Sequence, residues 1–89
     1  MNHRLAVMND IPILSKMNRE LTEDENHRNR FQTDAWFQQR MQTFLSGDYH
    51  AVIFEQDGKV LAYALYSNHP EHRNTIYLRQ IFVDRDFRR

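Results

Sequence analysis

Two adjacent arginines, Arg88 and Arg89, end the sequence shortly after a predicted strand. The segment Ile81–Arg89 (IFVDRDFRR) reads as the end of a buried strand, a short polar turn, the aromatic Phe87 and the basic pair. Backbone N–H groups at the start of a helix, joined by arginine side chains, can form a phosphate-binding cradle. The same residues also suit a charged tail that keeps the chain soluble, so both interpretations stay open at this point.

Histidine and cysteine chemistry is disfavoured by number and spacing. His69 and His72 lie three residues apart in a loop, but a zinc site needs three or four converging ligands. We therefore expect solvated loop histidines and no metal site. His50 begins a predicted strand and is interpreted as structural. The chain has no cysteine, and no serine lies in the G-x-S-x-G context of an activated nucleophile.

Two further groups of residues each allow two roles. The acidic run Glu23–Glu25 is typical of a solvated face, but it could also form a substrate-facing loop that attracts a cationic amine. Tyr63 and Tyr66 lie in a predicted strand, where packing is the usual role of tyrosine. A pocket role for one of them is the alternative.

Charge and hydropathy restrict the partners. Twelve basic and twelve acidic residues cancel, so no net field attracts the chain to nucleic acid or to an anionic membrane. No stretch approaches the roughly 18 apolar residues of a membrane helix, and no apolar signal segment follows Met1. We expect a soluble cytoplasmic protein.

The first helix is predicted to follow a short strand over residues 4–8. Asn9 and Asp10 offer capping oxygens, and Pro12 suits the first helical turn. Apolar residues then recur at spacings of three and four, as on one face of a helix: Leu14, Met17 and Leu21. The polar segment Thr22–Arg30 is interpreted as a solvated helix end and a mobile loop.

The second helix is predicted to begin at capping residues Thr33 and Asp34. Gly47 stands where a helix end favours a left-handed residue. The apolar stripe between these signals consists of Phe37, Met41, Phe44 and Leu45.

A hairpin is the clearest local signal, because Asp57-Gly58 separates two strand-like runs. Pairing outward from the turn predicts that residues on opposite strands meet as follows: Gln56 with Lys59, Phe54 with Leu61, Val52 with Tyr63, and on the other face Glu55 with Val60, Ile53 with Ala62, Ala51 with Ala64. Both faces are apolar near the middle, which predicts covering elements on both sides of the sheet.

The last strand is predicted over residues 75–83, after a loop at residues 67–74. The element order is therefore β-α-α-β-β-β, an α+β fold with a mostly antiparallel sheet. Residues 1–89 form a single domain.

With these residues in view, the chain resembles the N-terminal half of a GNAT-superfamily N-acetyltransferase. The resemblance includes the opening strand that runs into "NDIP", the two helices, the DG hairpin, and the ending "LRQIFVDRDFRR". The family pattern after the fourth strand is V-x-x-x-[YF]-R-x-x-G-x-G/A. Val83, Phe87 and Arg88 match its first half, and the sequence stops before the two glycines. The resemblance implies a partial domain that ends within the acetyl-CoA pyrophosphate-loop motif.

The resemblance also implies where acetyl-CoA binds. Backbone groups around Ile81, Phe82 and Val83 would hydrogen-bond the pantetheine arm as if it were an added strand. Arg88 and Arg89 would begin the loop that holds the pyrophosphate. The acetyl group would pass directly to a primary amine of a small molecule or peptide, which approaches from the helix–helix loop and the hairpin. A base or an ordered water would take the ammonium proton, and backbone donors would polarise the thioester carbonyl.

The catalytic base is where the sequence departs from the family. Many members carry Glu or Asp on the fourth strand, whereas Arg79 and Gln80 stand there in this chain. Gln80 could orient a water, and Arg79 could pair with an acidic substrate group. Proton removal would then fall to Glu55, to Tyr63, or to a residue of the half that the family adds, where a tyrosine often serves as general acid.

The 89-residue chain alone is expected to bind acetyl-CoA weakly or not at all, with negligible turnover, because the loop glycines are not in the sequence. Its last strand is expected to be an exposed edge that promotes a homodimer or higher self-association. The alternative is a non-enzymatic α+β dimerisation or binding module that shares only the topology.

Overall fold

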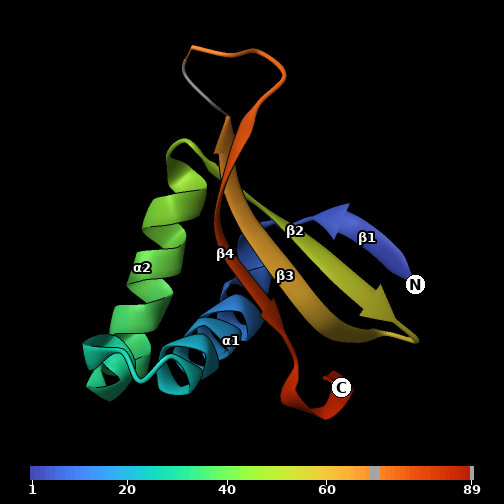
Figure 1. Ribbon diagram of the computed structural model, residues 1–89. Helices are drawn as coiled ribbons and strands as arrows, with labels where there is room; N and C mark the ends of the chain where they lie inside the picture. The colour runs from blue at the N-terminus through green and yellow to red at the C-terminus, as the bar shows by residue number, and fades with distance from the viewer. Residues whose placement is uncertain (69–70, 89) are drawn as a thin grey trace.

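An antiparallel sheet of four strands in the order β1-β2-β3-β4 carries two helices on one face in the computed structural model (Figure 1), which describes residues 1–68 and 71–88. The strands are β1 (Asn2–Leu5), β2 (Tyr49–Gln56), β3 (Lys59–Asn68) and β4 (Ile76–Val83), and the helices are α1 (Ile11–Asp24) and α2 (Asp34–Ser46). Short 3-10 turns lie at η1 (Met8–Asp10), η2 (Arg28–Phe31) and η3 (Arg85–Phe87). The predicted order β-α-α-β-β-β and the α+β class are confirmed.

The core lies between the helices and the sheet. Its buried members come from both helices and from three strands, and they are Leu14, Met17, Met41, Ala51, Ile53, Tyr63, Leu65 and Phe82. The opposite face of the sheet is not covered in the described residues, since Val52, Phe54 and Ala62 remain half-exposed there. The expectation of covering elements on both faces is therefore wrong for the part of the chain that the structure describes.

The first strand ends earlier than predicted, at Leu5 rather than Met8, and Asp10 explains the turn that follows. Its carboxylate accepts two hydrogen bonds from the Arg4 guanidinium, both at 2.9 Å, and one from the Val7 N–H at 2.8 Å. Asp10 occupies the N-cap position of α1 without a side-chain capping bond. Its carboxylate instead accepts the Val7 N–H as the third residue of η1, so Asp10 caps the turn that leads into α1 rather than α1 itself.

The start of α2 was predicted correctly, but the conformation of the residue at its end was not. Thr33 accepts a hydrogen bond from the Trp36 N–H at 3.1 Å, which confirms the predicted cap. Gly47 has φ −103°, so the predicted left-handed residue is wrong. The Gly47 N–H nevertheless donates to the Phe44 carbonyl at 3.2 Å, which closes the helix without a left-handed turn.

The hairpin turn is confirmed, with Asp57 at φ 54° and Gly58 at φ 79°, as a type I′ turn requires. The pairs next to the turn, Gln56 with Lys59 and Glu55 with Val60, are as predicted. A β-bulge then shifts the register by one residue, so the remaining predicted pairs are wrong. The observed partners are Phe54 with Ala62, Ile53 with Tyr63, Val52 with Ala64, and Ala51 with Leu65.

The bulge decides which side chains face the helices. A one-residue shift moves every later side chain of a strand to the other face. Tyr63 therefore shares the helix-covered face with Ile53, and both are 0% exposed. Without the bulge, Tyr63 would lie on the uncovered face.

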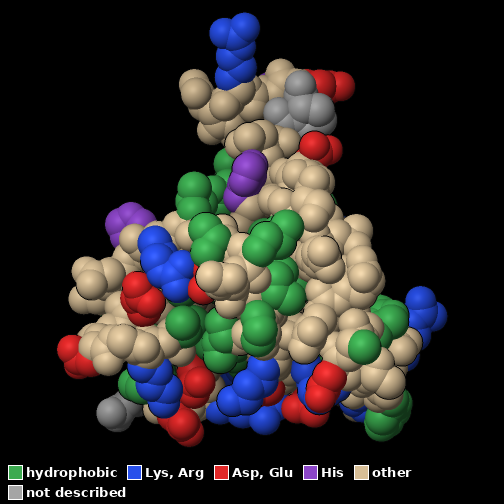
Figure 2. Space-filling view, turned by 180° about the vertical axis from the view of Figure 1, so that it is seen from behind, with side chains coloured by type: hydrophobic (Ala, Val, Ile, Leu, Met, Phe, Trp, Pro, Cys, Tyr) green, Lys and Arg blue, Asp and Glu red, His purple; other side chains and the backbone are tan. Residues whose placement is uncertain are grey.

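Charged side chains of both signs intermingle on the surface. Figure 2 shows this from behind, with Lys and Arg beside Asp and Glu around the lower part of that face and hydrophobic side chains gathered in its middle. Such mixing matches the zero net charge of the sequence. No helix in residues 1–68 and 71–88 has the length and apolar character needed to cross a bilayer.

Candidate active site

Three polar side chains from three elements meet at one end of the core. Asn18 of α1 donates through Nδ2 to the Tyr63 hydroxyl at 3.3 Å and to Oε1 of Gln80 at 3.1 Å. The Tyr63 hydroxyl of β3 donates to the same Gln80 oxygen of β4 at 3.0 Å. The cluster thus ties α1, β3 and β4 together and fixes the Gln80 carboxamide, whose NH₂ group is left to donate to a ligand or a water.

Burial sets the protonation state of Tyr63. Desolvation raises the pKa of the Tyr63 phenol to about 12, more than the Asn18 hydrogen bond lowers it. The phenol is therefore protonated at neutral pH. In this state Tyr63 acts as a hydrogen-bond donor to Gln80.

A second β-bulge positions Gln80. Leu65 pairs with Gln80 and Tyr66 pairs with Leu78, so Arg79 is the extra residue of β4. A bulge re-aims the side chains beside it. Here it lets Arg79 and Gln80, although adjacent in sequence, line one cavity.

This cavity has a volume of about 220 Å³ and lies between the end of α1, α2 and β4. Its polar lining includes Asn18, Glu25, His27, Arg40, Arg79 and Gln80. The Oδ1 atom of Asn18 is buried without a hydrogen-bond partner among the described residues. A buried carbonyl in that state costs about 1–3 kcal/mol, so it marks a position where a bound donor would be favourable.

β4 forms an open edge of the described sheet. The Asp84 N–H donates to the Leu61 carbonyl at 2.7 Å, and backbone groups of alternate residues point to the same side of a strand. Phe82 therefore directs its backbone groups to β3, whereas Ile81 and Val83 direct theirs to the open edge. The Val83 carbonyl points away from β3 as expected, because it accepts a hydrogen bond from Arg88 Nε at 2.7 Å.

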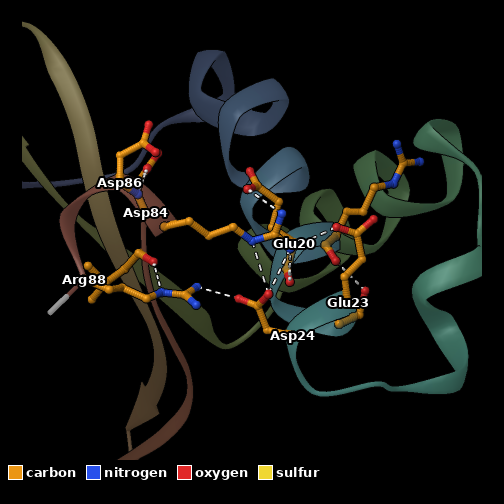
Figure 3. A network of polar contacts seen from close by, with 10 residues as sticks. Glu20, Glu23, Asp24, Asp84, Asp86 and Arg88 are labelled. Carbon is orange, nitrogen blue, oxygen red and sulfur yellow. Dashed lines mark hydrogen bonds and ion pairs between the residues drawn. The ribbon is translucent and has the colours of Figure 1, made fainter.

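The basic tail folds back onto α1. Figure 3 shows Arg88 reaching the Asp24 carboxylate, where Nη2 and Oδ2 lie 2.6 Å apart. Arg85 pairs with Asp24 at 2.9 Å and with Glu23 at 3.1 Å. The hydrogen bond from Arg88, followed by that from Arg85, lowers the pKa of Asp24 despite some desolvation. Glu23 and Asp24 of the acidic run are therefore neutralised by the arginines of the tail and are not free to attract a substrate amine.

The structure brings together some of the candidate site residues and separates others. Tyr63 and Gln80 share a hydrogen bond. Glu55 lies near the hairpin turn, where it accepts a hydrogen bond from Arg4 at 3.2 Å, and it does not line the cavity. The Phe82 side chain is in the core, at 2% exposed. Arg89 lies outside the described residues.

Two residues of the site, Asn18 and Arg40, were not singled out from the sequence. Asn18 carries a signal that could have found it, because it interrupts the buried helical face between Leu14 and Leu21 and is itself 0% exposed. A polar residue on such a face needs a partner. Arg40 gives no comparable signal, since its neighbours are set by the packing of α2 on β4.

Histidine spacing does not produce a metal centre in the described residues. No group of three or more His, Cys, Asp or Glu side chains converges in the parts of the chain placed by the structure. His69 falls outside the described residues.

The sequence of the chain shows the family to which it belongs. The sequence model of the acetyltransferase (GNAT) family matches residues 12–89, and the chain belongs to this family. No curated protein sequence matches the chain at a significant level.

Solved structures show the same fold. A possible acetyltransferase from Clostridium difficile 630 is similar with a TM-score of 0.81 and 20% identity, over 99% of this chain and 60% of that one. A predicted acetyltransferase from Clostridium acetobutylicum, solved with acetyl-CoA, is similar with a TM-score of 0.74 and 20% identity, over 98% of this chain and 62% of that one. The chain thus spans about three fifths of the length of these two proteins.

Proposed function

We propose that this protein transfers an acetyl group from acetyl-CoA to a primary amine. Family membership supports acetyl transfer as the class of reaction. A structural relative that was solved with acetyl-CoA supports the choice of donor. The observation that carries the proposal is the open edge of β4, which lies beside the Asn18–Tyr63–Gln80 cluster.

The residues present fit the pantetheine arm of acetyl-CoA. That arm contains two amide groups, and amides pair with an open strand edge as another strand does. Ile81 offers a backbone N–H and a carbonyl group there and Val83 a backbone N–H, and the two residues are 59% and 38% exposed. Arg88 lies at the end of the same edge, where it and Arg89 are proposed to contact the pyrophosphate.

Acetyl-CoA supplies the activated thioester, and the residues of the cavity are proposed to prepare the amine. Only a neutral amine can attack, so an ammonium proton must leave first. The N–C bond then forms as the thioester C–S bond breaks, and coenzyme A leaves as the thiol with the second proton that the amine gives up. Gln80 is held by two donors and presents its NH₂ group to a water that carries this proton. Glu25 is the carboxylate that lines the cavity, and we assign it as the final proton acceptor in place of Glu55, which is bonded to Arg4.

The proposal is tested by titrating the ¹⁵N-labelled chain with acetyl-CoA and following backbone amides by NMR. The proposed contacts cover the pantetheine arm and the basic tail only, so we expect a dissociation constant on the order of 1 mM. The amides of Ile81 and Val83 should shift most, and those of the hairpin turn should not move. Unchanged Ile81 and Val83 amides at 10-fold excess over that constant would contradict the proposal.

Self-association through β4 is a second proposal. Ile76, Leu78 and Ile81 are 54–59% exposed along this strand, and an open apolar edge favours pairing with another chain. Sedimentation should show a dimer that weakens in Leu78→Lys but not in Lys16→Glu on α1. A chain that is monomeric at all concentrations would refute this second proposal and leave the first intact.

A further inference from the structure

Two arginines without an acidic partner line the cavity beside Gln80. Arg40 comes from α2 and Arg79 from the bulge of β4. Neither forms an ion pair with any residue that the structure describes, whereas Arg4, Arg19, Arg85 and Arg88 all do. The two positive charges therefore line the same 220 Å³ space without a direct ion-pair partner there.

Aromatic rings hold both guanidinium groups in place. Cζ of Arg40 lies 5.3 Å from the ring centres of both Trp36 and Phe44. Cζ of Arg79 lies 5.1 Å from the Phe44 ring and 5.6 Å from the Tyr49 ring. Its Nη1 donates to the Tyr49 hydroxyl at 3.3 Å. A guanidinium stacked on a ring keeps its edge N–H groups available, and these groups match a carboxylate.

Two buried polar atoms of the site form no hydrogen bond with the described residues. Nε of Arg40 and Oδ1 of Asn18 are both buried and have no partner in the described part of the chain. Asn18 is 0% exposed, so water from the bulk does not reach it without entering the cavity. Burial, followed by the nearby charge of Arg79, lowers the pKa of Arg40. A desolvated cation in this state is stabilised by an anion that enters with it.

The charges around the cavity favour a zwitterion over a simple anion. Glu25 lines the same space as the two arginines. It would repel a second negative charge and attract an ammonium group. The unused Asn18 oxygen accepts a hydrogen bond and so also suits an amine N–H. One molecule that carries both an amine and a carboxylate satisfies all four groups.

We propose that the acetyl acceptor is a small amine that also bears a carboxylate, with the carboxylate bound by Arg40 and Arg79. The amine then points to Asn18, Gln80 and Glu25. This inference rests on the proposed function, because it names the substrate class of the same site. The cavity volume of about 220 Å³ accommodates an acceptor of the size of a small amino acid.

The test uses the labelled chain and reads the Nε–Hε signal of Arg40 by NMR. β-Alanine is titrated as the probe, and β-alaninamide serves as the matched molecule without a carboxylate. We expect β-alanine to shift the Arg40 signal saturably, with at least 10-fold weaker binding of β-alaninamide. Equal binding of the two probes, or no shift with β-alanine, would overturn the proposal. Inorganic phosphate that shifts Arg40 where β-alanine does not would also overturn it.

Variants separate binding from folding. Arg79→Gln and Arg40→Gln are each expected to weaken β-alanine binding about 10-fold. Arg73→Gln, which makes the same charge change in the exposed loop before β4, should bind like the parent chain. If Arg40→Gln fails to fold, the Arg79→Gln variant provides the test. Binding of β-alanine by Arg79→Gln with the affinity of the parent chain would overturn the proposal.

The two proposals fail in different ways. Acetyl-CoA is read at the Ile81 and Val83 amides, and β-alanine is read at Arg40. If acetyl-CoA shifts the edge amides but β-alaninamide binds as well as β-alanine, the substrate class is wrong and the proposed function stands. If β-alanine binds at Arg40 but acetyl-CoA leaves the edge unchanged, the proposed function is wrong and the carboxylate site stands.

Discussion

The Tyr63 hydroxyl donates a hydrogen bond to Oε1 of Gln80 over 3.0 Å. Two β-bulges are needed for this contact, since one turns Tyr63 to the helix-covered face and the other sets Gln80 opposite Leu65. The bond joins the inner strand β3 to the open strand β4 through Gln80, which lines the cavity. Its effect on stability can be measured separately from any activity.

Replacing Tyr63 by Phe removes the hydroxyl and keeps the ring. We expect a loss of about 1 kcal/mol in the free energy of unfolding, because Gln80 keeps the Asn18 bond and loses the other. Urea denaturation measures this change. Tyr66→Phe, on the uncovered face of the same strand, is the matched control and should change stability by less than about 0.5 kcal/mol. Equal effects of the two substitutions would show that the hydrogen bond from Tyr63 to Gln80 does not stabilise the folded protein.

Alkaline pH is expected to destabilise the protein through the same residue. The pKa of Tyr63 is about 12 in the folded chain, against 10.0 for an unperturbed tyrosine. The raised value means that stability is intact below pH 10 and falls as the pH rises from 10 to 12, where the unfolded chain ionises first. The urea midpoint should drop between pH 9.5 and 11.5, and Tyr63→Phe should reduce that drop. A midpoint that falls equally in both proteins would contradict the assignment.

Acidic pH is expected to destabilise the turn between β1 and α1. The Arg4 hydrogen bond, together with that from Val7, lowers the pKa of Asp10 below its usual 3.8, against the effect of desolvation. The stabilisation is present above pH 3.8 and is lost as the pH falls through the lower folded value. Asp10→Asn should lower the urea midpoint at pH 7 and remove part of the acid dependence below pH 3.8. An unchanged acid profile in this variant would disprove the role of the pair.

The two glycines should respond differently to alanine. Gly58 has φ +79° with open space around it, whereas a methyl group on Gly47 would meet the Thr43 carbonyl at an ordinary 3.4 Å. Gly58→Ala is expected to cost about 1–2 kcal/mol of stability, because a left-handed backbone is unfavourable for residues with a Cβ. Gly47→Ala should cost clearly less in the same urea titration. Equal losses would mean that the turn conformation is not what selects Gly58.

The basic tail should be held less tightly on α1 when Arg85 is neutralised. Arg85 contacts Glu23 and Asp24, and Arg88 contacts Asp24. Exposed ion pairs of this kind contribute about 0–1 kcal/mol, so Arg85→Gln should leave global stability nearly unchanged. Amide hydrogen exchange at residues 84–87 should nevertheless accelerate, as it should in parent protein at high salt. Arg28→Gln on η2 is the control, and identical exchange in all samples would contradict the tail contact.

Local signals in the sequence were sufficient for the elements but not for their register. Asp57-Gly58 predicts the hairpin because its positive φ angles are a property of the two residues themselves. The bulge beyond it depends on whether Tyr63 gains more from the helix-covered core than from the open face. That choice depends on contacts with α1, which are distant in sequence, so the faces of β3 were predicted wrongly.

The residues of the candidate site were also only partly predictable from the sequence. Tyr63 was singled out in its predicted strand and Gln80 through the family resemblance, and the structure joins them. Asn18 required recognising one polar residue in an apolar stripe. Arg40 becomes a site residue only when α2 packs beside the Arg79 bulge. Glu55 was chosen as a carboxylate near the hairpin, and its pairing with Arg4 could not be read from local spacing.

The central claim is that acetyl-CoA binds along the open edge of β4, and one pair of substitutions at Ile81 tests it most directly. Ile81→Pro removes the outward N–H group at a position where an edge strand tolerates proline. Ile81→Ala keeps that group and removes the side chain. By calorimetry or NMR, acetyl-CoA binding should weaken about fivefold in Ile81→Pro, as expected for one lost hydrogen bond, and stay near the parent value in Ile81→Ala. A folded Ile81→Pro protein that binds acetyl-CoA as tightly as Ile81→Ala would contradict the claim.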